Sequence, residues 1–485
     1  MIIKTRSVSC FLSMSVLSLL ATVGLADGAQ APPDRSDIKT EDTWNLQDMY
    51  ASQDAWKTHR DAIEALVGEL AARRGTAGES PEQLLAVLQL HDRINAELDK
   101  LYAYASMNFD QDMRQPSEQA IRDRARSLVA EYAESRAWLE PELTGLPREK
   151  VDAWLERDDL AVYRHFFDNL FRRSKHILSP REEELLAMAS KTSSASANTF
   201  RLLTNTELQR NTIKDSDGKN VIVTDAVYYD LISSKDRRVR KDVYLALHRS
   251  YMDVKSSLAS TLEGAAQRDW FYAKARGYNS SLEAALDQEN LPVGVYHNLI
   301  DTINKHLPLL HRYTALRKKV LELDEVHPYD LYVSLVDAPE QRYTYERARQ
   351  LIIESLEPIG KEYVDALKVG FDSRWVDVYE NKGKRSGAYC SGAYLVHPYV
   401  LLNFKGNYDG VSTVAHEMGH AMQSHFANTT QPPVYADYPM FTAEVASTAA
   451  EIVFNSRSGP TCKTRPPGLA IGSQPVAAKF FLAQV

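Results

Sequence analysis

The segment VSTVAHEMGHAMQSHF, residues 411–426, carries the most informative pattern of the chain, because it places two histidines four residues apart. On a helix, residues four apart differ by only about 40° around the axis, so His416 and His420 lie on one face. Two neutral imidazoles in this arrangement can hold one Zn²⁺. Glu417 lies about 100° from His416, beside the metal position, which suits a general base acting on water at the metal. The pattern HExxH therefore predicts a zinc-binding helix with a catalytic acid.

The alternative for these residues is a solvated helix face that binds no metal. Their neighbours argue against it, because the same segment carries many apolar side chains: Val411, Val414, Ala415, Met418, Ala421 and Met422. A helix of this kind is expected to be buried, and buried histidine and glutamate side chains need polar partners. A metal ion supplies such a partner, so the neighbours favour the zinc site.

A catalytic zinc usually has a third protein ligand, and the sequence offers two sources for it. One is a third histidine in an HExxHxxGxxH pattern, but Gln423 and Phe426 occupy the glycine and histidine positions. His425 misses the required position by one residue, which is about 100° on a helix. The other source is an acid on a second helix, and FTAEVASTAAEIVF, residues 441–454, resumes helical spacing after a proline-containing loop. We therefore assign its first acid, Glu444, as the third ligand.

A second acid on this predicted helix, Glu451, follows Glu444 by seven residues and occupies nearly the same angle two turns later. It is too far along the helix to share the metal. It is placed to accept a hydrogen bond from a ligand histidine and to fix the tautomer of that ring. A surface acid without a role is the alternative.

The composition limits the class of protein. The 485 residues are 44% hydrophobic and 25% charged, as in soluble globular proteins, and suffice for a large core or several domains. The formal net charge of −8 argues against a nucleic-acid-binding protein, which usually has a basic face. Apolar residues recur at three- and four-residue spacing along most of the chain, which predicts helix after helix. Residues 387–404 are rich in Gly, Tyr and Val and include Pro398, which favours a short edge strand.

The N-terminus has the pattern of a secretory signal peptide. Lys4 and Arg6 precede the apolar run FLSMSVLSLLATVGLA, which ends in small residues at Ala26. We therefore predict a signal peptide at residues 1–26 and an exported protein, periplasmic or secreted, with an uncleaved anchor as the alternative. A polar, proline-containing leader at residues 27–42 is predicted to be flexible.

Taken together, these features resemble the oligoendopeptidase F branch of the M3 zinc metallopeptidases, the group that includes thimet oligopeptidase. HEMGH alone would indicate only a zinc-dependent peptidase, whereas several further stretches agree with this branch, over roughly residues 43–455. The resemblance rests on TWNLQDMY at residues 43–50, YAKARGYNSSLEAAL at 272–286, RSGAYCSGAY at 385–394, HEMGH at 416–420 and AEVAST at 443–448.

The resemblance implies a mainly α, gluzincin-type ellipsoid with a deep channel and a small β element before the HExxH helix. It implies an N-terminal helical domain at residues 43–205 and a catalytic domain at residues 206–455. The strand before the HExxH helix would pair with the substrate backbone, which makes Tyr399, Leu401 and Asn403 candidate substrate-binding residues.

The resemblance also implies the chemistry. One Zn²⁺ per chain would be held by His416, His420 and Glu444, with Glu417 as general base and proton shuttle. The substrates would be short peptides cut at internal bonds, because the channel walls exclude folded proteins. Oligopeptides would be the only partners, with no nucleic acid and no membrane once the signal is cleaved.

Two departures from the family pattern qualify these expectations. Gln423 stands where the family commonly has a histidine. The family also continues past the second ligand helix with helices whose His and Tyr side chains hold the substrate and stabilise the oxyanion. Here residues 457–485 contain no Asp or Glu and four prolines. We therefore predict an aberrant or disordered tail at residues 456–485 and an incomplete catalytic domain.

Two functions follow from this sequence. The first is a zinc-dependent oligoendopeptidase; the alternative is a truncated, catalytically impaired zinc-binding member of the same family. A non-enzymatic helical scaffold is disfavoured because the chain shows no repeat period. A single-zinc aminopeptidase is disfavoured because residues 389–410 lack an acidic motif that would recognise a substrate N-terminus.

Overall fold

The structure is a computed structural model that describes residues 32–335 and 341–458. The described chain is mainly helical with two small sheets, so the predicted fold class and the small β element before the HExxH helix are confirmed. The predicted signal peptide at residues 1–26 lies outside the described residues, as does the predicted tail from residue 459 onward. The division into domains at residue 205 stays a prediction.

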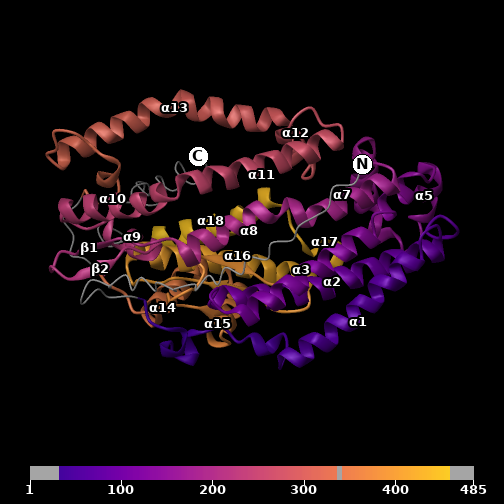
Figure 1. The fold of residues 1–485 in the computed structure, drawn as a ribbon, viewed down its shortest axis with the longest axis horizontal. Helices are drawn as coiled ribbons and strands as arrows, with labels where there is room; N and C mark the ends of the chain where they lie inside the picture. The colour runs from indigo at the N-terminus through magenta and orange to yellow at the C-terminus, as the bar shows by residue number, and fades with distance from the viewer. Residues whose placement is uncertain (1–31, 336–340, 459–485) are drawn as a thin grey trace, which may run out of the picture.

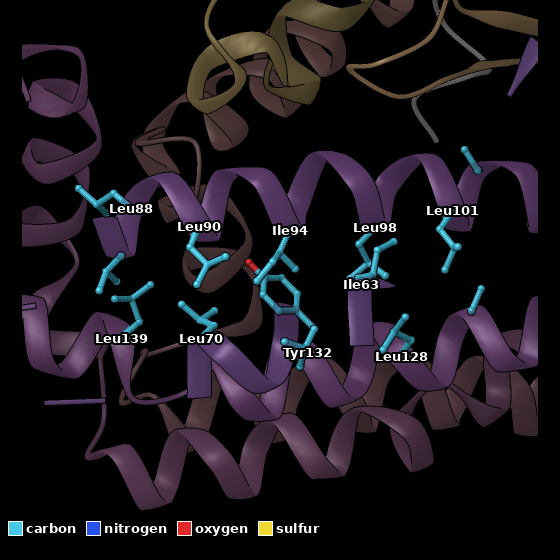
Figure 2. Packing of buried hydrophobic residues seen from close by; sticks show 14 of the residues in the cluster. Ile63, Leu70, Leu88, Leu90, Ile94, Leu98, Leu101, Leu128, Tyr132 and Leu139 are labelled. Atoms are coloured by element: carbon cyan, nitrogen blue, oxygen red, sulfur yellow. The ribbon is translucent and has the colours of Figure 1, made fainter. Parts of the chain in front are cut away.

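The first hydrophobic core lies among the helices nearest the N-terminus. Figure 2 shows leucine and isoleucine side chains of α2 meeting those of α1 and α3 across this core. Helices α1 and α2 begin at serine caps, since the Ser52 and Ser80 hydroxyls accept hydrogen bonds from amides in the first turn. The helices are α1 (Gln53–Ala72), α2 (Pro81–Gln111), α3 (Pro116–Ser135), α4 (Leu139–Thr144), α5 (Arg148–Trp154) and α6 (Arg164–Arg172).

A second core joins four helices to a three-stranded sheet. The helices are α14 (Tyr345–Leu356), α15 (Lys361–Asp372), α16 (Tyr408–Thr430) and α18 (Met440–Ser458). The strands are β3 (Val376–Asp377), β4 (Tyr389–Ser391) and β5 (Tyr399–Leu401).

The sheet order is β3-β5-β4, with β3 parallel and β4 antiparallel to β5. Strand β5 is therefore central, and the prediction that it is an edge strand is wrong. Pro398 directly precedes β5 and so removes no hydrogen bond from its ladder.

A third, smaller core lies among a β-hairpin and the two helices that follow it. It contains the hairpin of β1 (Thr212–Lys214) and β2 (Asn220–Ile222), followed by α9 (Asp225–Leu231) and α10 (Arg237–Asp253). The carboxylate of Asp330 is fully buried and accepts hydrogen bonds from Arg237 (2.8 and 3.0 Å) and Arg240 (3.0 Å). These bonds fix the first turn of α10 to Asp330, in the segment that follows helix α13 (Val293–Val320).

Helices α11 (Lys255–Ala275) and α13 (Val293–Val320) run along the side of the molecule opposite α1, with α16 and α18 between them and α1 (Figure 1). Helix α7 (Pro180–Ser193) packs against α3 and α11, α8 (Ala195–Leu202) packs against α11, and α12 (Ser281–Asp287) joins α11 to α13. Helix α13 buries only Arg317, and apolar side chains such as Leu262 of α11 (72% exposed) and Val445 of α18 (65%) face solvent. Contiguous exposed apolar surface usually marks a site that other protein covers.

The described part of the leader, residues 32–42, contacts the rest of the chain, and its flexibility stays a prediction. Arg35 forms an ion pair with the fully buried carboxylate of Asp377 and donates a hydrogen bond to Gln111 (2.9 Å). Lys384 also contacts Asp377 (2.6 Å), and burial lowers the pKa of Lys384 to about 8. A buried carboxylate needs such partners, and Arg35 docks the leader by supplying one of them.

Helix α18 continues to Ser458, past the predicted end of the catalytic domain at residue 455. In the part of the chain that is described, none of the helices combines the length and apolar character needed to cross a membrane.

Candidate metal centre

Helix α16 presents both predicted histidines on one side. The helix begins at Asn407, whose side chain accepts a hydrogen bond from the amide of Gly410. The apolar side chains flanking the histidines, such as Met418, are fully buried in the second core. The rings of His416 and His420 are perpendicular, with centroids 5.0 Å apart. The periodicity of the segment thus separates an apolar face from the pair of imidazoles.

The chain returns to this site through α17 (Pro433–Ala436) and enters α18 at Met440. The carboxylate of Glu289, from the loop after α12, accepts hydrogen bonds from the amides of Met440 (2.8 Å) and Phe441 (3.1 Å). An acid at a helix N-terminus satisfies free amides and interacts favourably with the helix dipole. Glu289 therefore fixes the start of the helix on which Glu444 lies one turn later.

Helices α16 and α18 approach closely at Gly419. A Cβ atom added to Gly419 would lie 2.7 Å from Cα of Ser447, 2.9 Å from the carbonyl oxygen of Ala446 and 3.0 Å from Cβ of Ala450. Only glycine allows this backbone contact. The glycine inside HEMGH thus sets how near α18 comes to the histidines.

The structure brings His416, His420 and Glu444 together, and their candidate ligand atoms all lie within 4.8 Å of one another. Oε2 of Glu444 is 3.4 Å from Nε2 of His416 and 3.6 Å from Nε2 of His420. In a tetrahedral zinc site with bonds near 2.1 Å, ligand atoms are about 3.4 Å apart. The two nitrogens and one oxygen therefore fit a divalent metal such as Zn²⁺, and His₂Glu is a known ligand set for catalytic zinc.

Glu451 lies where a partner for a ligand histidine is needed. It is 7% exposed, and its carboxylate accepts hydrogen bonds from Ser412 Oγ (2.9 Å) and from Nδ1 of His416 (3.3 Å). Because Nδ1 of His416 is bonded to Glu451, Nε2 of the same ring points toward Glu444 and is left to bind a metal. Burial alone lowers the pKa of His416, but the bond to Glu451 and the charge of Glu417 outweigh it and raise the pKa. Because it is buried and bonded, Glu451 is not a surface acid.

Two further side chains of α16, Glu417 and His425, lie in different surroundings. Glu417 is 7% exposed and lines the cavity beside His416, and its charge adds to burial in raising the pKa of the Cys390 thiol. His425 packs against Trp375, with ring centroids 5.9 Å apart, and is not among the residues grouped at the metal centre. Among the described residues, Glu444 is the side chain that joins His416 and His420 as a third candidate metal ligand.

A cavity of about 970 Å³ opens over this centre. Its floor includes Thr413, His416 and Glu417 of α16 and Glu444 of α18. Its lining also includes Ser386, Gly387, Ala388 and Asn403 near the sheet, and Asp225 and Tyr229 of α9 together with Tyr332. A volume of this size holds several residues of an extended peptide.

The predicted substrate-binding residues divide into two groups. Tyr399 and Leu401 are fully buried and do not line the cavity, because both lie on the central strand of the sheet. Asn403 does line the cavity, but its amide donates hydrogen bonds to the carbonyl oxygens of Arg385 (3.0 Å) and Gly387 (2.8 Å). Asn403 therefore holds the wall segment in place, and the edges of the sheet belong to β3 and β4.

Comparison with known proteins gives the family. The sequence profile of Peptidase family M3 matches residues 230–459, and that of Oligopeptidase F matches residues 142–209. The chain is 42% identical over 446 residues to oligopeptidase PepF of Bacillus subtilis, covering 91% of this chain and 67% of that protein. The chain belongs to the M3 peptidase family. Its place in the oligoendopeptidase F branch, as the sequence motifs indicated, makes it a metalloendopeptidase by class.

Further relatives agree with this M3 assignment. Group B oligopeptidase PepB of Streptococcus agalactiae is 37% identical over 418 residues, which cover 86% of this chain and 69% of that protein. The crystal structure of oligoendopeptidase-F from Enterococcus faecium matches with a TM-score of 0.64 and 30% identity, covering 85% of this chain and 68% of that one. The M3 fold and the peptidase class therefore rest on both sequence and structure.

Sequence reasoning missed the residues that hold the ligands in place. Gly419, Ser412, Ser447 and Glu289 each act through a contact with another helix or with a ligand carboxylate. The signal for Ser447 was present in its spacing, three residues after Glu444. For Glu289 there was no signal, because it contacts α18 across 151 positions of sequence.

Proposed function

We propose that the chain is a zinc-dependent oligoendopeptidase that hydrolyses internal bonds of short peptides. The observation that carries this proposal is the cluster of His416, His420 and Glu444, of which His416 and Glu444 line a cavity of about 970 Å³. The peptidase family supports the same substrate class, and so do the relatives, which are named oligopeptidases. The net charge of −8 supports a partner other than nucleic acid.

The residues have distinct parts in this proposal. His416, His420 and Glu444 hold the ion, and zinc supplies Lewis-acid polarisation of the scissile carbonyl and of the attacking water. The carboxylate of Glu417 takes a proton from that water as its oxygen bonds to the carbonyl carbon. It then delivers the proton to the amide nitrogen as the C–N bond breaks, so that water and peptide give one carboxyl and one amine product. Glu451 keeps His416 in the tautomer that directs Nε2 to the ion.

The test is cleavage of an internally quenched fluorescent peptide of about ten residues. We expect turnover that a chelator abolishes and zinc restores, and Glu417→Gln is expected to lower kcat about 10²- to 10⁴-fold while zinc stays bound. Glu362→Gln, an exposed acid on α15, is the matched control and should leave kcat unchanged. Turnover by Glu417→Gln at the parent rate would refute the role of Glu417.

A second candidate is a zinc-binding protein of this family with impaired turnover. It is favoured by the exposed apolar side chains of α11, α13 and α18, such as Leu262, Leu309 and Val445, which no other described residues cover. The prediction that residues 456–485 form an aberrant tail belongs to this candidate. One zinc per chain without chelator-sensitive cleavage would support it, and turnover at the rate of a longer relative would exclude it.

We also propose that the protein is exported to the periplasm or beyond the cell, on the strength of the signal-peptide pattern at residues 1–26. The measurement is the N-terminal sequence of the protein recovered from the producing cell. A mature protein that begins near residue 27 supports export, and an intact N-terminus in the cytoplasmic fraction contradicts it.

A further inference from the structure

Ser447 lies on α18 one turn after Glu444, where this helix crosses α16. Its side chain is 0% exposed, and its hydroxyl contacts Oε2 of Glu444 (2.9 Å) and the carbonyl oxygen of the same residue (3.2 Å) as donor. The same Oε2 atom lies 3.4 Å from Nε2 of His416 and 3.6 Å from Nε2 of His420. One buried hydroxyl therefore touches the ligand atom that faces both histidines.

Glu444 needs such a restraint more than the other residues of the centre. Its side chain is 57% exposed, whereas the side chains of His416 and His420 are 26% and 15% exposed. An exposed glutamate samples several rotamers in solution and loses that freedom when it binds an ion. A hydrogen bond to an ionised carboxylate is stronger than one between neutral groups, so Ser447 favours the rotamer that already faces the histidines.

Packing alone does not explain a serine at this position. Ser447 is fully buried where α18 meets Gly419 of α16, and its Cα would lie 2.7 Å from a Cβ added to Gly419. Alanine, which lacks only the hydroxyl oxygen, would fill the Ser447 position equally well. Serine hydroxyls inside helices often bond to a carbonyl of the preceding turn, but here the contact with the carboxylate is the shorter of the two.

We propose that Ser447 is a positioning residue of the metal centre: its hydroxyl holds the Glu444 carboxylate in the orientation that binds the ion. This inference rests on the proposed zinc site. It assigns Ser447 no contact with substrate or with the reacting atoms.

The experiment compares the zinc affinity of the full chain with that of Ser447→Ala, by competition with a chromophoric chelator. We expect binding about 10- to 100-fold weaker in the variant, as for other residues that support a ligand. The urea midpoint of the metal-free protein should stay unchanged, because alanine keeps the packing. Ser456→Ala is the matched control, since its hydroxyl bonds to the carbonyl of Val453 (2.8 Å) with the same three-residue spacing on the same helix.

A double-mutant cycle identifies the residue through which Ser447 acts. In a Glu444→Ala background, Ser447→Ala should change zinc affinity less than twofold, because the group that the hydroxyl orients is gone. The visible spectrum of the Co²⁺-loaded single variant should also differ from that of the Co²⁺-loaded parent.

The outcomes separate this inference from the proposed function. A parent chain that binds no zinc would overturn both. A parent that binds zinc while Ser447→Ala binds it equally well overturns only the role of Ser447. An equal loss of affinity in the Glu444→Ala background would show a general structural effect and would likewise overturn it.

Discussion

Replacing Gly419 by alanine tests whether the close crossing of α16 and α18 sets the geometry of the metal centre. The new Cβ would lie 2.7 Å from Cα of Ser447, while carbon atoms in ordinary contact are about 3.5–4.0 Å apart. Because the contacted atoms are backbone, the helices must separate by about 1 Å. Overpacking of this kind costs about 1–3 kcal/mol, of which the better helix propensity of alanine offsets up to about 1 kcal/mol.

The same shift would reach the ligands. Glu444 lies on the helix that must move, and Oε2 is now 3.4 Å from Nε2 of His416. Metal sites tolerate changes of only about 0.2 Å in ligand distances. With the full offset, we therefore expect Gly419→Ala to lower the free energy of unfolding of the metal-free chain by up to about 2 kcal/mol. Its zinc affinity should fall about 10- to 100-fold.

The matched control is Gly68→Ala in α1, where an added Cβ meets nothing within 4 Å. This change should raise the free energy of unfolding by about 0.5–1 kcal/mol and leave zinc affinity as it was. Urea unfolding followed by circular dichroism gives the stabilities, and chelator competition gives the affinities. If Gly419→Ala behaved like Gly68→Ala in both assays, the close crossing would not set the position of Glu444.

Three further outcomes follow from other contacts. Burial alone raises the pKa of Asp330, but hydrogen bonds from Arg237 and Arg240 outweigh burial and lower the pKa to about 2. The ionised carboxylate therefore stabilises the folded state fully above pH ~4, and this contribution is lost as the pH falls through 2. Asp330→Asn should therefore cost about 2 kcal/mol at pH 7 and flatten the acid limb of a stability curve measured from pH 2 to 7; an unchanged limb would contradict the assignment. Arg35→Ala leaves the buried Asp377 with one cation fewer, and limited proteolysis should then cut the leader faster than in the parent, with equal rates as the contrary result. Removing zinc with a chelator should lower the melting temperature of the parent, whereas in a variant with both His416→Ala and His420→Ala the melting temperature should barely respond.

The sequence by itself determined the helices and the reacting groups. HEMGH places two imidazoles and a carboxylate around one helix by spacing alone. Helical spacing in residues 441–454 likewise identified Glu444 as the first acid of the next helix. Glu451 was found by the same periodicity, seven residues on. These features are local, because the geometry of a helix converts short spacings directly into positions in space.

Only the tertiary structure decided how those groups are held. The strand at Tyr399–Leu401 became central because β3 pairs with it from a segment more than twenty residues earlier, which no alternation of residues reveals. Arg35 fixes the leader through Asp377 across 342 positions. The distance between α16 and α18 depends on a Cβ that Gly419 lacks. Such contacts depend on which surfaces meet after folding, and spacing along the chain carries no information about that meeting.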